Sequence, residues 1–471
     1  MDSRITARSL AASLGGWRTR TPTYEALADG IRLLCLDNRI AAHTVLPAER
    51  ELASALALSR STVAAAYRSL RATGHIDSVR GSGSVTLPQI RRASERVFSA
   101  GEGIDLQQAS PAAWPGLAGI IADVAADAAS LVGRPGYDIV GSTALRTAVA
   151  DRYTARGIPT APDEILITTG GQHAIHLVTT ALLRRGDAVV METPTYPHAA
   201  EAVRATGARL SGIPVSTETG WDLDRAEQVF RRVRPTVGYL MPWFQNPTGA
   251  VMTPREIVTI RSAAAAAGTV LIIDETTAEL AIEDPGPIDA DFGAGAIRIG
   301  SLGKTVWGGL RIGWVRAEAT MIRRLIALRP SRDLGTPELE QAIATRLLRM
   351  MPEILPQRSA LLRIGRDTVA SALRSRLPEW QIPDVRGGVS LWVGLDAPLS
   401  GALVMAAGGR GVYLSAGPRF ALEGGHDGHL RIPFTGPPDQ LRRAVDVLAD
   451  LWPQVRQGAP AVATDAMAAI V

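Results

Sequence analysis

The stretch IRIGSLGKTVWGGLR, residues 297–311, links an apolar, strand-like run to Lys304, the single lysine of this 471-residue chain. The other 49 of the 50 basic residues counted as lysine or arginine are arginine. A coding bias against lysine accounts for that excess, and one surviving lysine can then stand anywhere by accident. Arginine nevertheless cannot replace lysine where an amine must lose its proton and attack a carbonyl carbon. Lys304 is therefore a candidate for Schiff-base chemistry. The residues around it in the fold determine whether that chemistry is expected.

Four further apolar runs resemble the one that precedes Lys304, and polar or glycine residues follow each of them. They are EILITT (164–169), AVVMET (188–193), GYLMP (238–242) and TVLIIDE (269–275). Because helical patterns lie between the runs, we expect an α/β fold whose mostly parallel sheet has helices on both faces. Ligands of such sheets bind at the carboxyl ends of the strands. The candidate site therefore lies in the residues that follow these runs.

The five strand ends carry groups of different chemistry. In chain order they are Gly171 and Gln172, Tyr196, Asn246, Asp274, and Ser301, Lys304 and Arg311. An amine condenses with an aldehyde, a carboxylate keeps a pyridine nitrogen protonated, and an aromatic ring stacks on the pyridine. Helix-terminal N–H groups, a hydroxyl and a guanidinium bind a phosphate. Each residue alone has a plainer explanation, such as a helix cap or an ion pair, but together they suit pyridoxal 5′-phosphate (PLP).

The N-terminal fifth of the chain carries the whole net charge. Residues 1–87 hold 11 arginines against 7 aspartates and glutamates, a difference of +4. The remaining 384 residues hold 39 positive and 39 negative side chains, which cancel. A local basic excess is typical of a domain with an anionic partner such as nucleic acid.

The order of elements in this N-terminal part is that of a winged helix-turn-helix. Helical spacing begins at Tyr24, and LPAERELA (46–53) and SRSTVAAAYRSL (59–70) predict two more helices across a short turn. HIDSV (75–79) and SVTL (84–87) then predict a β-hairpin. The second helix of such a unit enters the major groove of DNA. The residues expected to contact DNA are Arg50, Ser59, Arg60, Ser61, Thr62, Arg68 and, at the wing tip, Arg80, Gly81, Ser82 and Gly83. The alternative is a helical oligomerisation domain with a solvated arginine face.

Two segments of the chain carry family resemblances. LPAERELA, SRSTVAAAYRSL and the GHIDSVRGSGSVT wing (74–86) resemble the GntR-type DNA-binding domain. Roughly residues 104–457 resemble the fold-type-I aminotransferases. The matching motifs are NPTG (246–249), IIDE (272–275), Ser-x-x-Lys with an arginine seven residues beyond the lysine, and HLRIPF (429–434). A GntR-type domain joined to such a module resembles the MocR subfamily of PLP-dependent transcriptional regulators.

This resemblance implies a role for each matching residue. Lys304 would form the internal aldimine, and Asp274 would pair with the pyridine nitrogen. Asn246 would hydrogen-bond the phenolic oxygen of the cofactor, and Tyr196 would stack on its ring. Arg431 would bind the α-carboxylate of a substrate or effector. The cofactor phosphate would be held by Gly171, Gln172, Ser301, Arg311 and the partner subunit's Tyr137.

One position departs from the family pattern. Fold-type-I aminotransferases usually carry a tyrosine three residues after the aspartate, where its hydroxyl also meets the ring oxygen. This chain has Thr277 there, and a threonine hydroxyl is too short for that contact. We expect a shifted imine pKa and inefficient transamination, with cofactor binding retained.

Composition sets the remaining expectations. No apolar run reaches the roughly 20 residues that span a bilayer, and the N-terminus lacks the apolar core of a signal peptide, so we expect a cytoplasmic protein. Cys35 is the only cysteine, which excludes an internal disulfide and favours a buried thiol. No metal site is expected. We divide the chain into a winged helix-turn-helix domain (1–87), a linker (88–103), a PLP-binding domain (104–457, with a small α+β subdomain from roughly 345) and a tail expected to be disordered (458–471).

We therefore expect a regulator that binds operator DNA and senses an amine or amino acid through aldimine exchange at Lys304. We expect a homodimer with head-to-tail domain exchange, because fold-type-I sites are completed by two subunits. One alternative is a working aminotransferase that carries a DNA-binding domain, which steady turnover of an amino acid with a keto acid would favour. Another is a DNA-binding protein whose second module has lost its cofactor and only dimerises.

Overall fold

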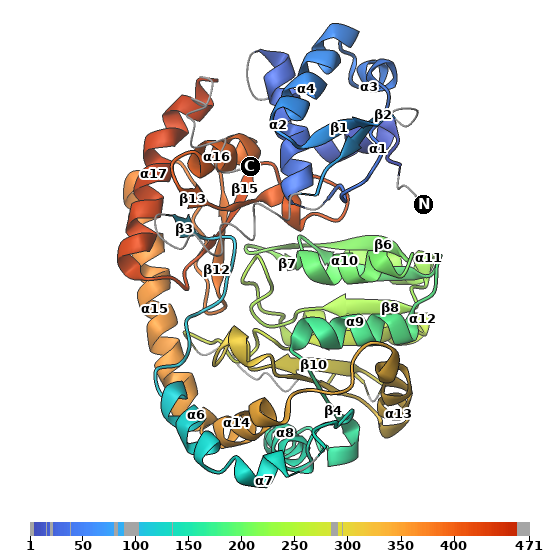
Figure 1. The fold of residues 1–471 in the computed structure, drawn as a ribbon, viewed down its shortest axis with the longest axis vertical. Coiled ribbons are helices and arrows are strands. Elements are labelled where there is room, and N and C mark those ends of the chain that lie inside the picture. Colours follow the sequence, from blue (N-terminus) through green and yellow to red (C-terminus); the bar gives the residue numbers. More distant parts are fainter. Residues whose placement is uncertain are drawn as a thin grey trace.

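The computed structural model describes residues 4–15, 17–18, 22–37, 39–79, 83–88, 103–133, 135–283, 291–293 and 295–458. Three groups of predicted residues lie outside the described ones: Arg80, Gly81 and Ser82 of the wing tip, linker residues 89–102, and tail residues 459–471. Figure 1 shows the N-terminal domain, in blue, above a larger body. In that body an orange and red subdomain stands beside a green and yellow sheet domain.

The N-terminal domain packs helices against a β-hairpin. Its elements are α1 (Ala7–Leu14), α2 (Thr23–Leu36), α3 (Glu49–Leu56), α4 (Arg60–Ala72), β1 (Ile76–Val79) and β2 (Gly83–Thr86). α3 ends at Ala57, whose left-handed φ of 53° turns the chain towards α4. Ser59 then caps α4 by accepting the N–H of Thr62 at 3.1 Å. The strands pair antiparallel from Ile76↔Thr86 to Val79↔Gly83. The predicted order of helix, turn, helix and wing is confirmed.

An eight-stranded sheet forms the centre of the larger body in the described part of the chain. In spatial order its strands are β4 (Ile165–Thr168), β11 (Gly313–Arg316), β10 (Ile297–Ser301), β9 (Val270–Asp274), β8 (Val237–Leu240), β5 (Ala188–Thr193), β6 (Arg209–Ser216) and β7 (Gly220–Trp221). The strands from β10 to β6 run parallel to one another, whereas β11 and β7 run antiparallel to their neighbours. All five predicted runs are strands, and the prediction of a mostly parallel sheet is confirmed.

Helices cover both faces of the sheet because its strands are apolar on both sides. They are α8 (Thr143–Ala155), α9 (Gly171–Leu182), α10 (Pro197–Ala205), α11 (Leu223–Val233), α12 (Pro254–Ala267) and α13 (Ala319–Leu328). α9, α10 and α13 share one apolar core with the sheet, and α11 and α12 share another. Further helices pack near the edge strand β4, namely α6 (Leu117–Ala126), α7 (Ala129–Val132) and α14 (Glu338–Arg349).

The small subdomain has its own sheet and core. Its strands are β12 (Ser390–Gly394), β15 (His429–Pro433) and β14 (Ser415–Ala416), and its helices are α15 (Met351–Arg376), α16 (Ser400–Gly408) and α17 (Pro438–Arg456). A separate pair joins β13 (Val412–Tyr413) in parallel to β3 (Ile104–Asp105). This pairing carries the segment after residue 103 into the same core and on towards the carboxyl edge of the large sheet. Figure 1 shows α15 running along the body from the small subdomain to α14.

The N-terminal domain rests on the small subdomain through α1 and α2. Leu33 of α2 packs against the apolar core of the small subdomain. A Cβ added at Gly401 of α16 would lie 3.2 Å from Leu33 Cδ2, so these helices are in van der Waals contact. Cys35, predicted to be buried, is 7% exposed. Within the described ranges, no helix is both long and apolar enough to cross a membrane.

Candidate cofactor site and DNA-binding surface

A cavity of about 680 Å³ opens at the carboxyl ends of β8, β9 and β10. The predicted residues among those that line it are Gly171, Gln172, Tyr196, Asn246, Asp274, Ser301, Lys304, Arg311 and Arg431. The fold thus brings together side chains from positions 171 to 431 of the sequence. Tyr137 is the exception, because it is 74% exposed and is not among the residues lining this cavity.

Lys304 follows β10 in the turn before the short helix η2 (Gly308–Leu310). Its Nζ donates a hydrogen bond to the carbonyl oxygen of Ala109 at 2.7 Å. Burial disfavours the charged amine, and the guanidinium of Arg431 adds positive potential. Together they lower the pKa of Lys304 to about 8. This amine loses its proton more readily than an exposed lysine.

Asp274 ends β9 and is almost fully buried. Its Oδ2 accepts a hydrogen bond of 2.5 Å from the Tyr239 hydroxyl, and its Oδ1 accepts the N–H of Thr276 at 2.9 Å. Burial raises the pKa of Asp274, and these hydrogen bonds partly counteract that effect. A carboxylate held in this way gains most from a cationic partner in the cavity.

The start of α9 presents backbone N–H groups that no side chain of the described residues caps. Gly170, before the helix, has a φ of +88° and makes no side-chain cap, so the first N–H groups point outward. A Cβ at Gly170 would lie 2.7 Å from Arg311 Nη2, and one at Gly171 would lie 3.0 Å from Thr276 Cγ2. Ser301 Oγ donates to Ile312 O at 2.9 Å and lines the same end of the cavity. Two glycines, a helix N-terminus, a hydroxyl and a guanidinium suit a phosphate group.

The opposite wall carries Tyr196 and Asn246. The Tyr196 ring packs edge-on against His198, with ring centroids 5.3 Å apart, and its hydroxyl lies 3.2 Å from His198 Nδ1. Burial raises the pKa of Tyr196 to about 12. Asn246 Oδ1 is buried and accepts no hydrogen bond within the described residues. Thr277 also lines the cavity, but its hydroxyl donates to Trp243 O at 2.9 Å.

Arg431, on β15, is buried at the far end of the cavity. Its Nη2 donates to the Gln107 carbonyl, and its guanidinium carbon lies 4.9 Å from the centroid of the Phe420 ring. Its Nε is buried without a hydrogen-bond partner among the described residues. Burial lowers the pKa of Arg431 to about 10. A buried guanidinium with an unsatisfied donor is suited to a carboxylate ligand.

Sequence reasoning missed several residues in and around the cavity. Tyr239 does not line the cavity itself but donates a hydrogen bond to Asp274, and its signal in the sequence was a tyrosine within the apolar run GYLMP. Gln107 and Ala109 reach the cavity only because β3 pairs with a strand some 300 positions later, and no local motif marks them. Asp37 and Arg419, which also line the wall, likewise depend on tertiary packing.

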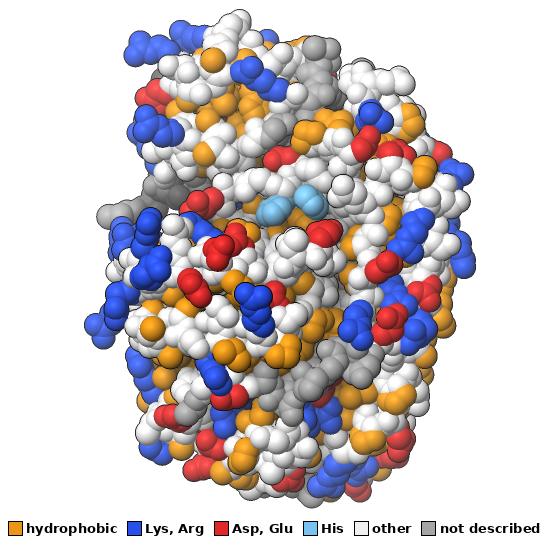
Figure 2. All heavy atoms as spheres, turned by 180° about the vertical axis from the view of Figure 1, so that it is seen from behind, with side chains coloured by type: hydrophobic (Ala, Val, Ile, Leu, Met, Phe, Trp, Pro, Cys, Tyr) orange, Lys and Arg blue, Asp and Glu red, His pale blue; other side chains and the backbone are white. Residues whose placement is uncertain are grey.

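The predicted DNA contacts gather at the N-terminus of α4. Ser59 Oγ lies 2.8 Å from Ser61 Oγ and 2.7 Å from Thr62 Oγ1, so three hydroxyls cluster at the helix start. Arg60 points into solvent with 75% of its side chain exposed, 3.8 Å from Glu49. Arg50, Arg68 and Gly83 are exposed too. Basic side chains are visible on the outer edge of this domain, at the top of Figure 2.

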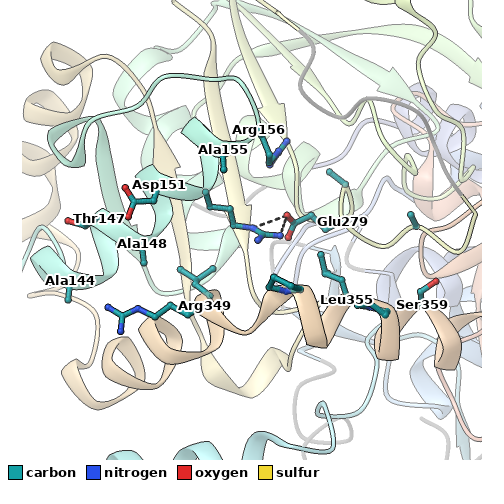
Figure 3. A pocket seen from close by; sticks show the side chains of 16 residues that line it. Ala144, Thr147, Ala148, Asp151, Ala155, Arg156, Glu279, Arg349, Leu355 and Ser359 are labelled. Atoms are coloured by element: carbon teal, nitrogen blue, oxygen red, sulfur yellow. Dashed lines mark hydrogen bonds and ion pairs between the residues drawn. The ribbon is translucent and has the colours of Figure 1, made fainter.

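A second cavity, of about 860 Å³, lies away from this chemistry (Figure 3). Arg152 of α8 and Glu279 both line it and form an ion pair. Ala148 and Leu355 contribute apolar wall. It is larger than the candidate site but does not contain the predicted site residues. We therefore do not assign the reactive centre to this second cavity, although it is the larger of the two.

Two family models match the chain. "Aminotransferase class I and II" matches residues 126–448, and "Bacterial regulatory proteins, gntR family" matches residues 23–85. Among curated relatives, a 2-aminoadipate transaminase of Thermus thermophilus is 32% identical over 292 residues, which are 60% of this chain and 73% of the relative. The HTH-type transcriptional regulator YdfD of Bacillus subtilis is 26% identical over 431 residues, or 83% of this chain and 87% of the relative.

A solved structure shares the fold of the larger body. It is LysN, an alpha-aminoadipate aminotransferase of Thermus thermophilus complexed with N-(5′-phosphopyridoxyl)-L-leucine. Its TM-score is 0.70 at 28% sequence identity, and the match covers 78% of this chain and 95% of LysN.

The residues of the cavity fit PLP. Asn246 Oδ1 and Gln172 Oε1 are buried polar atoms without partners in the described chain, and the α9 N–H groups are uncapped. A phosphorylated ring with polar substituents would satisfy them, and Lys304 supplies the amine. The chain therefore belongs to the aminotransferase class I and II family, whose fold-type-I domain is PLP-dependent, and joins that domain to a GntR-family DNA-binding domain in the architecture of the MocR regulators.

Proposed function

We propose that this protein is a transcriptional regulator that binds operator DNA through its N-terminal domain and responds to an amine or amino acid at the PLP site. The observation that carries the proposal is that the DNA-binding domain rests on the subdomain that supplies Arg431. A ligand can shift the arrangement of two domains only if it binds one arrangement more tightly. A site that lies beside the domain junction is suited to do so.

When bound, PLP supplies an aldehyde that condenses with amines and a ring that withdraws electrons. Lys304 would hold it covalently, and its lowered pKa supports that role. Asp274 would hold a proton on the ring nitrogen, and Tyr196 would stack on the ring. Asn246 would bind the ring oxygen. The phosphate would lie on Gly171, Gln172, Ser301 and Arg311.

Arg431 would bind the α-carboxylate of the ligand, since the Nε donor of its buried guanidinium has no partner in the described part of the chain. This role depends on the ligand being an amino acid, and a simple amine would leave the donor unused.

The alternative is an active aminotransferase with a DNA-binding domain. The presence of Lys304, Asp274 and Arg431 in one cavity favours it. Against it, the Thr277 hydroxyl donates to the Trp243 carbonyl and so offers the ring oxygen no phenol. Repeated turnover of an amino acid with a keto acid acceptor would favour the enzyme. Binding of one amino acid per site without further turnover would favour the regulator.

We further propose a homodimer in which the partner subunit's Tyr137 reaches the phosphate. The 74% exposure of Tyr137 in one chain supports this, as do the exposed apolar side chains of Val132, Leu361 and Ile364. Head-to-tail domain exchange remains a prediction. So do the domain limits, with the DNA-binding domain at 1–87, the linker at 88–103 and the small subdomain from about 345. Operator binding implies action in the cytoplasm.

The test is DNA affinity measured with and without amino acids. The probe is a duplex selected from random sequence by the PLP-loaded protein. We expect at least one amino acid to change the Kd for this duplex about 10-fold in the wild type, within the usual range of allosteric coupling. The same amino acid should leave the Kd of Lys304→Ala unchanged. Equal responses of the two proteins would contradict the proposal.

A further inference from the structure

One wall of the PLP cavity comes from the DNA-binding domain. α2 ends at Leu36, and both Leu36 and Asp37 line the cavity beside Arg419. α2 also packs on α4, the helix expected to read DNA: Leu27 and Ile31 share a fully buried core with its side chains. A ligand that touches the end of α2 therefore touches the same rigid unit that holds α4.

Each charged side chain that lines the described wall of this cavity, except Asp37, has either a proposed ligand group or an ion-pair partner. The proposed function assigns the cofactor and the α-carboxylate to Lys304, Asp274, Arg311 and Arg431. Arg419 is paired within the chain, with Nη1 lying 2.6 Å from Glu201 Oε1. Asp37 is the remaining charged residue of the described wall.

One oxygen of the Asp37 carboxylate has no hydrogen-bond donor. Its Oδ2 is buried and accepts no hydrogen bond, and the carboxylate forms no ion pair, in either case among the described residues. Burial raises its pKa to about 6, although the charges of Arg419 and Arg39 act to lower it. A buried carboxylate without a hydrogen-bond donor is unfavourable, and a cation that reaches it is bound strongly.

We propose that Asp37 binds the distal ammonium group of a diamino acid whose α-carboxylate lies on Arg431. This inference rests on the proposed function, because Arg431 and Lys304 fix the other end of the ligand. A dicarboxylic amino acid is disfavoured, since its second carboxylate would face Asp37 while Arg419 is already neutralised by Glu201. An aliphatic amino acid would leave the buried Oδ2 of Asp37 without a donor.

Contacts with both domains would let a bound ligand influence the DNA-binding domain. A diamino acid held at one end by Arg431 of the small subdomain and at the other by Asp37 binds only when the two domains are docked. It therefore stabilises the docked arrangement and resists any rearrangement of α4.

The experiment uses full-length, PLP-loaded protein and two pairs of matched ligands. L-lysine is compared with L-norleucine, and L-ornithine with L-norvaline, because the members of each pair differ only in the distal amine. Affinity is measured by calorimetry. A shift of the visible absorption band of bound PLP shows that the amino acid has reacted with the cofactor. The variants are Asp37→Asn and, as control, Asp427→Asn. Asp427 lies at the same junction, 2.9 Å from a Cβ built on Gly15, but lines the neighbouring small cavity.

We expect at least one diamino acid to bind about 10-fold or more tightly than its partner in the wild type and in Asp427→Asn. Asp37→Asn should lose that preference, with its affinity for norleucine and norvaline unchanged. Equal affinities within both pairs in the wild type, or a preference retained by Asp37→Asn, would overturn the inference and leave the PLP site standing. Absence of any cofactor band in the wild type would overturn the proposed function as well.

Discussion

Lys304 lies where burial and charge both oppose a proton on its amino group. Its side chain extends into the cavity and donates to Ala109 O, while the positive Arg431 acts from the far end. A pKa of about 8 leaves roughly a tenth of the amine uncharged at pH 7, far more than an exposed lysine would have. The unprotonated amine is the form that attacks a carbonyl carbon.

The ionisation of Lys304 can be followed directly because the chain has no other lysine. In the cofactor-free protein we expect the rate of acylation at Lys304 to rise with pH and to reach half its maximum near pH 8. Below that pH the amine is protonated and unreactive. Mass spectrometry of the peptide that contains Lys304 measures the rate separately from the N-terminal amine. Arg431→Met should move the midpoint upward, and a wild-type midpoint near the ordinary 10.5 would contradict the account.

The candidate site was predictable residue by residue where a motif fixes the spacing. Lys304, Asp274 and Asn246 each follow an apolar run, and such runs mark buried parallel strands. Tyr239 lies inside one of these runs and Asp37 follows none of them, so their places in the site depend on which strand lies next to β9 and on how α2 docks. Contacts between distant segments are set by tertiary packing, which a single sequence does not display.

At the scale of elements, the turn before α9 and strand β11 approach closely. A Cβ on Gly313 would lie 2.6 Å from Gly170 C and 2.8 Å from Gly171 N. Both are backbone atoms, so Gly313→Ala must displace the N–H groups expected to bind the phosphate. We expect the Kd for PLP to rise about 10-fold, as for the loss of a hydrogen bond to a charged group. Gly119→Ala is the control, because a Cβ there has nothing within 4 Å, and equal Kd values for both variants would argue against phosphate binding at this turn.

The N-terminus of α4 is the element expected to meet DNA. Arg60 is exposed and weakly paired, so it is free to contact a phosphate or a base edge. We expect Arg60→Ala to weaken DNA binding and, if the contact is to phosphate, to lower the slope of log K against log salt by about 1. Fluorescence anisotropy across a salt series measures both quantities. Arg231→Ala, on an exposed position of α11, should leave them unchanged.

The sheet could be predicted only in part. β5, β8 and β9 are buried on both faces and therefore stand out as apolar runs. β6 was not predicted, because Gly212 and Pro214 interrupt its pattern, and neither was β11, a four-residue strand that ends in Arg316. β6 is eight residues long and parallel to β5, and β11 is short and antiparallel, but both mix apolar with polar residues, so sequence pattern identifies them poorly.

In the assembled protein, each cofactor site is expected to take residues from two subunits. If the partner subunit's Tyr137 completes the phosphate site, Tyr137→Phe should weaken PLP binding in a protein that remains dimeric by analytical ultracentrifugation. Mixing Tyr137→Phe with Lys304→Ala subunits should then create hybrid dimers with one intact site. We expect spectral titration with PLP to show tight binding in up to a quarter of the sites for an equal mixture. Binding no tighter than in the separate variants would show that Tyr137 acts within its own chain or not at all.

Lys304, the sole lysine of this DNA-binding protein, is expected to hold PLP. The most direct measurement is the visible absorption spectrum of the full-length protein with PLP, recorded beside that of Lys304→Ala. We predict a band of lysine-bound cofactor in the wild type, absent from the variant, and fixed to the Lys304 peptide after borohydride reduction. Spectra of free aldehyde in both proteins would contradict the account and leave the larger domain as a dimerisation scaffold without its cofactor.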